Sequence, residues 1–216
     1  MDAVDLGLRV DDIWFRYSRN TAWVLSGASY VFEPGTVSAI TGPSGRGKST
    51  LLYILGLLVR AERGQIFIGP QRLDSARDVV RSAFRARDIG FVFQDAVLDP
   101  TRTVLENVME SQIYGARSPA LLERATLLLQ HFDVGSTSSR RPLQLSGGQQ
   151  HRVALARALL HDPSIILADE PTGNLDRHNG DVVLRALRDH ADRGGIVVVA
   201  THDPLVASMA DRQVRL

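Results

Sequence analysis

Four short runs of branched apolar residues constrain the fold of this chain more than any other feature of its 216 residues. They cover residues 37–41, 89–93, 165–168 and 196–200, and each is followed by a polar or glycine-rich turn. Runs that are apolar almost throughout are typical of strands buried on both faces, as in parallel sheets. Helical patterns at 49–58 and 182–190 lie between them. This alternation favours a doubly wound α/β domain.

The residues that follow these runs are of types that commonly bind ligands or take part in catalysis. In open α/β sheets, ligands bind just beyond the carboxyl ends of the strands. The four runs are followed by Gly42, by Gln94, by Asp169 with Glu170, and by His202. A glycine-rich loop, an amide, two carboxylates and an imidazole would therefore meet at one edge of the sheet, which predicts a functional site there.

Two further regions differ from this pattern. Alternating apolar residues within 1–35, among them Ile13 and Phe15, predict a small antiparallel sheet. Residues of about 95–145 are mostly helical in pattern and predict a helical lobe inserted into the core. We therefore expect a single domain over 1–216, with the core and the β subdomain in about 1–94 and 146–216.

The bulk composition narrows the function classes. A net charge of +1 provides no strong basic field for nucleic acid, and the absence of cysteine excludes disulfides and thiolate metal sites. The first ten residues lack the apolar core of a secretory signal. The most apolar run, 51–59, is far shorter than the roughly 20 residues of a spanning helix. We expect a chain that meets a membrane only through a partner.

Residues 42–49 fit the phosphate-loop pattern G-x-x-x-x-G-K-[ST], after a strand and before a helix. The glycines let backbone N–H groups face a phosphate, and the helix N-terminus adds positive potential. Lys48 would reach the β- and γ-phosphate oxygens, and the Ser49 hydroxyl would bind Mg²⁺. The alternative, a glycine-rich turn with a solvated lysine, is disfavoured by the flanking strand and helix. The expected nucleotide contacts here are Gly42, Pro43, Ser44, Gly45, Arg46, Gly47, Lys48, Ser49 and Thr50.

Asp169 and Glu170 directly follow a buried apolar run. A Mg²⁺ ion held by Ser49 and phosphates needs a nearby carboxylate, and Asp169 is placed to supply it. Glu170, one residue farther, points to the other side of the strand and could polarise an attacking water. The alternative is a charged turn closed by Pro171, which the phosphate loop makes less favourable.

A second phosphate-binding device follows the predicted lobe. Ser146 can cap the helical stretch at 149–160, and Gly147 and Gly148 leave its N–H groups open to an anion. As structure alone, this would be a capped helix after a loop. The chain has no second phosphate loop for it to serve, which suggests a site shared between two molecules.

Together these motifs resemble those of the ABC ATPase family over essentially the whole chain. The family order is phosphate loop, glutamine loop, signature, acidic strand, Asp loop and switch histidine. The corresponding residues here are 42–49, Gln94, 145–149, 165–170, 174–176 and His202. The resemblance implies an α/β fold with a phosphate-loop NTPase core and a mostly parallel sheet. It also implies an N-terminal antiparallel β subdomain and an inserted helical subdomain.

The resemblance further implies a head-to-tail dimer that binds ATP and Mg²⁺. The signature would contact ATP bound to the opposite subunit, and Glu170 and His202 would act on the attacking water, Glu170 as general base. Gln94 would contact water and Mg²⁺ and sense the transporter. Asp176 would lie at the dimer seam. The expected signature contacts are Ser146, Gly147, Gly148 and Gln149.

Tyr17 aligns with the aromatic residue that stacks on adenine in this family, although an aromatic in a small sheet is often packing alone. The implied function is ATP hydrolysis that drives a separate membrane permease from the cytoplasmic face of the cell membrane. The second ATPase subunit would be an identical copy or a different chain. No nucleic-acid partner is expected.

Residues 103–108 and 169–176 resemble the branch for lipoprotein release, macrolide efflux, peptide export and bacterial cell division. One alternative is therefore a regulatory ATPase at the division site that moves no cargo. Non-transport ABC ATPases usually join two such domains or insert long coiled coils, and this chain has neither. A kinase or GTPase is disfavoured because no Asn-Lys-x-Asp motif is present.

The chain also departs from the family pattern. Arg46 stands where a small residue is usual, and His151 stands where a third glutamine is usual. Asp95 and residues 98–100 alter the segment after Gln94 that normally meets the permease.

Overall fold

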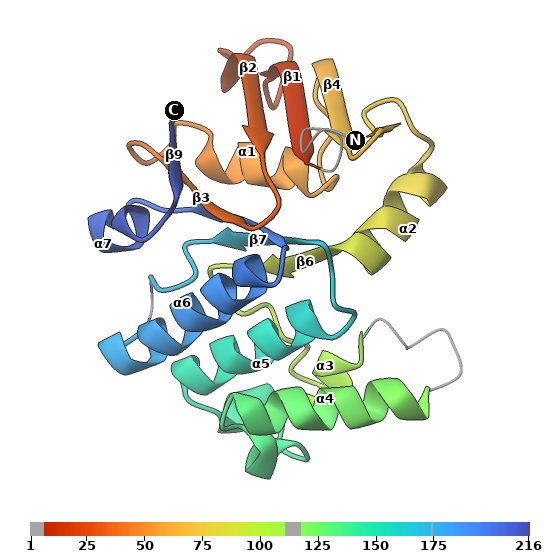
Figure 1. Ribbon diagram of the computed structural model, residues 1–216, viewed down its shortest axis with the longest axis vertical. Helices are drawn as coiled ribbons and strands as arrows, with labels where there is room; N and C mark the ends of the chain where they lie inside the picture. Colours follow the sequence, from red (N-terminus) through yellow and green to blue (C-terminus); the bar gives the residue numbers. More distant parts are fainter. Residues whose placement is uncertain (1–6, 111–117, 174) are drawn as a thin grey trace.

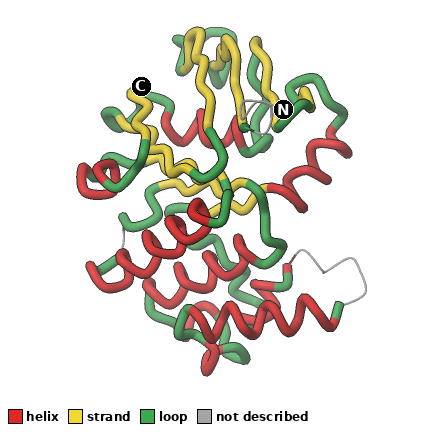
Figure 2. Tube along the Cα trace, in the orientation of Figure 1, coloured by secondary structure: helices red, strands yellow, loops and turns green. Residues whose placement is uncertain are grey.

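The computed structural model describes residues 7–110, 118–173 and 175–216 (Figure 1). The strands are β1 (Leu8–Phe15), β2 (Leu25–Phe32), β3 (Thr36–Thr41), β4 (Arg63–Ile68), β5 (Gln71–Arg72), β6 (Ile89–Val92), β7 (Ile165–Asp169), β8 (Ile196–Ala200) and β9 (Arg212–Arg215). The helices are α1 (Lys48–Leu55), α2 (Asp78–Asp88), α3 (Val104–Val108), α4 (Pro119–His131), α5 (Gly147–Leu159), α6 (Arg177–Asp192), α7 (Pro204–Ser208) and the 3-10 helices η3 (Gly135–Thr137) and η4 (Pro142–Gln144). Figure 2 shows the strands in the upper and middle parts of the view, with most helical residues below them.

Five strands form a parallel sheet in the order β6-β7-β8-β3-β9. It contains the four strands predicted from the apolar runs, each within one residue of its predicted ends. The edge strand β9 has no apolar run to predict it, because Arg212, Gln213 and Arg215 are polar and exposed. Polar residues are common on edge strands, where they discourage pairing with other chains.

Alternate residues of the sheet enter two different hydrophobic cores. Ile165 and Leu167 pack with α1 and the antiparallel sheet, whereas Ile166 and Ala168 pack with α5 and α6. The alternation follows from the pleat, which turns successive side chains to opposite faces. All five residues of β7 and of β8 are buried. Two covered faces confirm the predicted α/β architecture and explain why these runs are apolar almost throughout.

A second sheet, antiparallel in the order β2-β1-β4-β5, covers α1 on the side away from the parallel sheet. Its first two strands lie in the region 1–35, where an antiparallel sheet was expected. The prediction missed β4 and β5, which come from residues 63–72. Residues 1–6 lie outside the described part of the chain.

The region between β6 and α5 is helical, as expected, and contributes α3, α4, η3 and η4. Its apolar side chains share one core with α5 and α6, so the lobe and the signature helix pack together. Residues 111–117 of the predicted lobe lie outside the described residues. The boundaries at about 95 and 145 stay a prediction.

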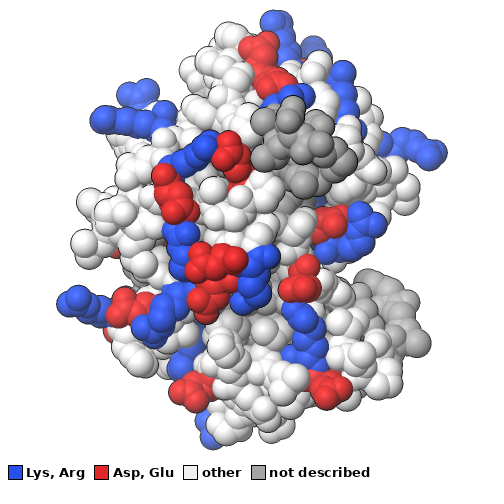
Figure 3. Space-filling view, in the orientation of Figure 1, with Lys and Arg blue, Asp and Glu red and all other residues white. Residues whose placement is uncertain are grey.

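No helix within the described ranges is both long and apolar enough to cross a bilayer. On the face shown in Figure 3, basic and acidic side chains lie next to one another rather than in separate patches. Ion pairs between surface side chains include that of Arg188, which lies 3.0 Å from an Asp211 oxygen and 3.7 Å from an Asp192 oxygen.

Replacement of Gly90 by alanine tests how closely β6 and α5 pack. A Cβ added at Gly90 would overlap with the Ala158 carbonyl oxygen of α5, so Gly90→Ala forces strand and helix apart. We expect a loss of about 1–3 kcal/mol in the free energy of unfolding, measured in urea. The control is Gly180→Ala in α6, where the nearest atom to the added Cβ, Thr172 Cγ2, is 3.6 Å away. Replacing that helical glycine should leave stability unchanged or raise it by up to about 1 kcal/mol. Equal stability of the two variants would contradict the close packing.

Candidate functional site

The carboxyl ends of β3, β7 and β8 lie side by side because β8 pairs with both of the other strands in parallel. The phosphate loop follows β3, Asp169 ends β7, and Thr201 and His202 follow β8. Gln94 lies two residues beyond β6, which pairs with β7. The predicted polar residues therefore reach one edge of the sheet, as the strand pattern indicates.

The phosphate loop ends in the first turn of α1. Gly47 precedes α1 with a φ of 91°, and a Cβ added there would lie 3.0 Å from Val24 Cγ1. Only glycine fits this left-handed backbone and close approach. Lys48 is the only lysine of the chain, and its side chain is buried. Its Nζ donates to the carbonyl oxygens of Gly42 at 2.9 Å and Pro43 at 3.2 Å. The cation is thereby held across the loop that would cradle a phosphate.

Tyr17 lies beside the same helix. Its hydroxyl is 2.9 Å from the Thr50 Oγ1, and its side chain is 71% exposed. An exposed ring next to the phosphate loop supports the expected stacking on a base, which stays a prediction. The Arg46 side chain is also exposed, and so the bulky cation that departs from the family pattern does not fill the loop.

Asp169 lies at the centre of the site and is 4% exposed. Its Oδ1 accepts a hydrogen bond from the Ser49 hydroxyl at 2.9 Å, and its Oδ2 accepts one from the Tyr53 hydroxyl at 3.1 Å. Burial raises the pKa of Asp169, and the two hydrogen bonds oppose this shift. Burial together with the neighbouring carboxylate raises the pKa of Tyr53 to about 12, so Tyr53 remains a donor.

The residues around Asp169 fit a magnesium ion. Among the described residues, no group of three or more His, Asp or Glu side chains could hold a metal by itself. Mg²⁺ commonly takes one or two protein oxygens and fills its shell with phosphate oxygens and water. Ser49 and Asp169 supply two adjoining hard oxygens at the edge of a phosphate loop. The third predicted ligand, Gln94, has an exposed side chain with no hydrogen bond to either residue in the described part of the chain.

Glu170 follows β7 with a φ of 44°, a left-handed conformation that is rare for a residue other than glycine. Its Oε2 accepts a hydrogen bond from Thr201 Oγ1 at 3.0 Å, and its Oε1 accepts one from the His202 backbone N–H at 3.0 Å. The same Oε1 lies 2.5 Å from His202 Nδ1. Two of the three predicted catalytic side chains, Glu170 and His202, are therefore in contact, and Glu170 is held against the end of β8.

The signature forms a second helix N-terminus. The Ser146 Oγ accepts a hydrogen bond from the Gln149 N–H at 3.3 Å, and the Gln149 Oε1 accepts one from the Ser146 N–H at 3.0 Å. This reciprocal capping box fixes the first turn of α5. A Cβ added at Gly147 would meet no other part of the described chain within 4 Å, apart from its own helix and neighbouring residues, whereas one added at Gly148 would lie 2.7 Å from Asn179 Cγ. The start of α5 is therefore open on one side and packed against α6 on the other.

The two helices that are predicted to bind phosphate lie on opposite faces of the parallel sheet. The apolar side chains of α1 pack in the core beneath the antiparallel sheet, and those of α5 pack in the core with α3, α4 and α6. Figure 1 shows α1 above the sheet and α5 below it. The structure therefore does not join the signature to the phosphate loop within one chain.

Asp176 caps α6 and accepts a hydrogen bond from the Asn179 N–H at 2.9 Å. Because Asn179 also lies against Gly148, the predicted seam residue is close to the signature. Asn174, which belongs to the expected Asp loop, lies outside the described residues.

The structure adds contacts between α5 and the segment after β6 that the motifs did not predict. The Nε2 of His151 lies 2.7 Å from the Gln94 carbonyl oxygen, and His151 is buried. Arg157 donates to the carbonyl oxygens of Ala96 at 2.9 Å and Val97 at 2.8 Å. In the sequence, His151 stands out only because a glutamine is usual at its position. Its contact with Gln94 could not be predicted, because only the fold brings the two residues together.

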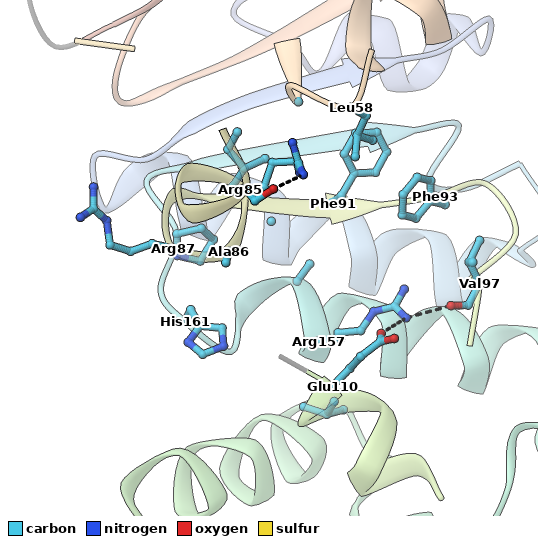
Figure 4. A pocket seen from close by; sticks show the side chains of 17 residues that line it. Leu58, Arg85, Ala86, Arg87, Phe91, Phe93, Val97, Glu110, Arg157 and His161 are labelled. Carbon is cyan, nitrogen blue, oxygen red and sulfur yellow. Dashed lines mark hydrogen bonds and ion pairs between the residues drawn. The ribbon is translucent and has the colours of Figure 1, made fainter. Parts of the chain in front are cut away.

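A groove of about 640 Å³ is lined by Phe93 and Val97, which lie on either side of Gln94 in the chain (Figure 4). Phe91 and Phe93 lie stacked along it with ring centroids 4.2 Å apart. Arg85 and Arg87 of α2 lie on one side, and Arg157 lies on the other, 3.4 Å from a Glu110 oxygen. The groove thus combines an aromatic surface with basic side chains.

Comparisons with known proteins agree with this geometry. A family model described as "ABC transporter" matches residues 25–173. The lipoprotein-releasing system ATP-binding protein LolD of Anaeromyxobacter dehalogenans is 44% identical over 196 residues, which cover 89% of this chain and 82% of the relative. LolD of Paramagnetospirillum magneticum is 40% identical over 214 residues, which cover 97% and 95% of the two chains. The ATP-binding cassette MJ0796, solved as a dimer in a post-hydrolysis state bound to ADP and Pi, is 35% identical with a TM-score of 0.88. That match covers 97% of this chain and 94% of the cassette chain.

Lys48→Ala tests the phosphate loop. We expect ATP affinity in the presence of Mg²⁺ to fall roughly 10- to 100-fold, the scale of one lost hydrogen bond to a charged group. Isothermal titration calorimetry gives the affinity. Arg193→Ala removes an exposed cation at the end of α6, away from the phosphate loop, and should leave the affinity unchanged. Equal ATP affinities of Lys48→Ala and the parent would contradict the assignment.

Proposed function

The chain belongs to the ABC transporter family as an ATP-binding subunit with ATPase activity, and on this premise we propose that two such subunits close head to tail around ATP. The observation that carries the proposal is that α1 and α5, whose N-termini both suit a phosphate, lie on opposite faces of one sheet. Each ATP would lie between the phosphate loop of one subunit and Ser146, Gly147, Gly148 and Gln149 of the other. The proposal holds whether the second subunit of the dimer is an identical copy or a different ATPase chain.

The open first turn of α5 supports this arrangement. The side chains of Ser146 and Gln149 bind each other's backbone N–H groups, and no other segment among the described residues crowds Gly147. The free N–H groups and the helix dipole favour an anion at this point. Asp176 lies next to this turn through Asn179, which supports its place at the dimer seam.

We assign the other contacts of each bound ATP to the subunit that contributes the phosphate loop. Lys48 and the loop N–H groups would bind the β- and γ-phosphates, and Tyr17 would stack on the adenine. Ser49 and Asp169 would hold Mg²⁺, with Gln94 as a further contact. The ion, when bound, neutralises charge that develops on the phosphates.

Glu170 is the proposed general base. Its carboxylate is oriented by Thr201 and by the His202 backbone. It lies at the same edge of the parallel sheet as the phosphate loop. A carboxylate fixed in this way can accept a proton from a water that attacks the γ-phosphate. His202, in contact with Glu170, would bind that water and the γ-phosphate.

The permease is the proposed partner at the groove beside Gln94. An aromatic surface flanked by arginines fits a short amphipathic segment with an acidic residue. We place the chain at the cytoplasmic face of the membrane, in contact with it only through the permease. The LolD relatives support release of lipoproteins as the process that this chain drives. Co-purification in detergent from the native membrane is the measurement that identifies the permease.

Glu170→Gln should block hydrolysis while leaving binding intact. We expect turnover to fall roughly 10²- to 10⁴-fold, the usual worth of general-base assistance, and an ATP-bound dimer to accumulate. Steady-state hydrolysis and size-exclusion chromatography with ATP give the two readouts. Glu33→Gln is a matched control, because Glu33 precedes β3 and so lies at the opposite end of the sheet. Turnover of Glu170→Gln within a few-fold of the parent would rule out this base.

Two defective chains should complement each other if the signature acts in trans. Ser146→Arg and Lys48→Ala should each be inactive alone, whereas the mixed dimer contains one site with an intact loop and an intact signature. We expect ATPase activity to recover in part on mixing, in the assembled complex or at high protein concentration. Ser118→Arg, at the start of α4, controls for the effect of arginine at a helix N-terminus. No recovery in verified heterodimers, with single-site turnover established separately, would disprove the composite site.

A further inference from the structure

We infer that the Tyr53 hydroxyl positions the Asp169 carboxylate for Mg²⁺, an inference that rests on the proposed role of Asp169 as a magnesium contact. Tyr53 belongs to none of the motifs in the family order. It lies in α1, four residues after Ser49, so the two hydroxyls emerge on the same face of the helix.

The two hydroxyls hold the two oxygens of one carboxylate. Ser49 donates to Oδ1 at 2.9 Å, and Tyr53 donates to Oδ2 at 3.1 Å. Contacts at both oxygens fix the rotation of the carboxylate about its Cβ–Cγ bond. The oxygen next to Ser49 is thereby kept toward the phosphate loop, where Mg²⁺ would bind. Partners of this kind, which orient a ligand without touching the metal, govern metal affinity.

Burial makes the Tyr53 hydrogen bond consequential. Asp169 is 4% exposed, so water cannot readily replace a lost donor at Oδ2. Removal of the hydroxyl would therefore leave Oδ2 without its donor and free the carboxylate to rotate away from the phosphate loop.

The ring of Tyr53 is held by the aromatic surface of the groove. Its centroid lies 5.7 Å from that of Phe91 and 6.5 Å from that of Phe93. Both phenylalanines line the groove proposed for the permease, and Phe93 directly precedes Gln94. Tyr53 thus stands between the groove and the magnesium carboxylate. Its orientation is set by residues that a bound partner would contact.

The test compares nucleotide affinity with and without the ion. A non-hydrolysable ATP analogue is titrated into the full chain in MgCl₂ and again in EDTA, and the ratio of the two affinities gives the gain due to Mg²⁺. Tyr53→Phe removes only the hydroxyl and should lower this gain about tenfold or more, without changing the affinity in EDTA. Tyr30→Phe makes the same chemical change in β2 and should leave both affinities unchanged.

Asp169→Asn separates the inference from the function on which it rests. If this variant abolishes the gain but Tyr53→Phe keeps it, Tyr53 does not position Asp169. A Tyr53→Phe variant that loses affinity equally in MgCl₂ and in EDTA has a general structural defect, and the inference is again wrong. If Asp169→Asn keeps the full gain, the magnesium contact itself is misassigned, and the inference fails with it. Thermal melting of all variants confirms that each is folded.

Discussion

The parallel pairing of β8 with β3 on one side and β7 on the other is the constraint on which the functional edge depends. Ala200 lies opposite Ile40 of β3 and also opposite Asp169 of β7. This shared register sets the phosphate loop, Asp169 and His202 at the same height along the strands. A slip of one residue would turn the apolar side chains of a strand to the wrong core and would move its polar end away from the site. Correct burial and correct site geometry are therefore selected by the same register.

At this edge the chain combines several locally unfavourable features. Lys48 and Asp169 are buried ionisable groups, and Glu170 has a left-handed backbone. Each cost is offset by a specific contact: loop carbonyls for Lys48, two hydroxyls for Asp169, and the end of β8 for Glu170. Departures from local preference are typical of functional sites, where groups must be oriented before the ligand arrives. Fixed polar groups in a partly dry site act more strongly on charge than they would in water.

The sequence predicted those parts of the fold whose pattern is local. The runs that became β7 and β8 are apolar throughout because both faces of the sheet are covered, and the phosphate loop is defined by contiguous residues. The edge strand β9 has polar, exposed residues and offers no such pattern. Tyr53 belongs to no motif, and His151 is marked in the sequence only as a departure from the family pattern. Their roles arise from contacts with Asp169 and with Gln94, 116 and 57 residues away in the chain, and only the fold brings these pairs together.

The attachments of α5 have a mechanical consequence. The helix has 13 residues and so extends over roughly 20 Å. The signature begins it, the ring of His151 meets the Gln94 carbonyl one turn later, and Arg157 binds the Ala96 and Val97 carbonyls near the far end. A rod fixed to the same loop at two points cannot rotate independently of it. A tilt of the segment at 94–97 should therefore move α5 with it, and with α5 the signature at its start.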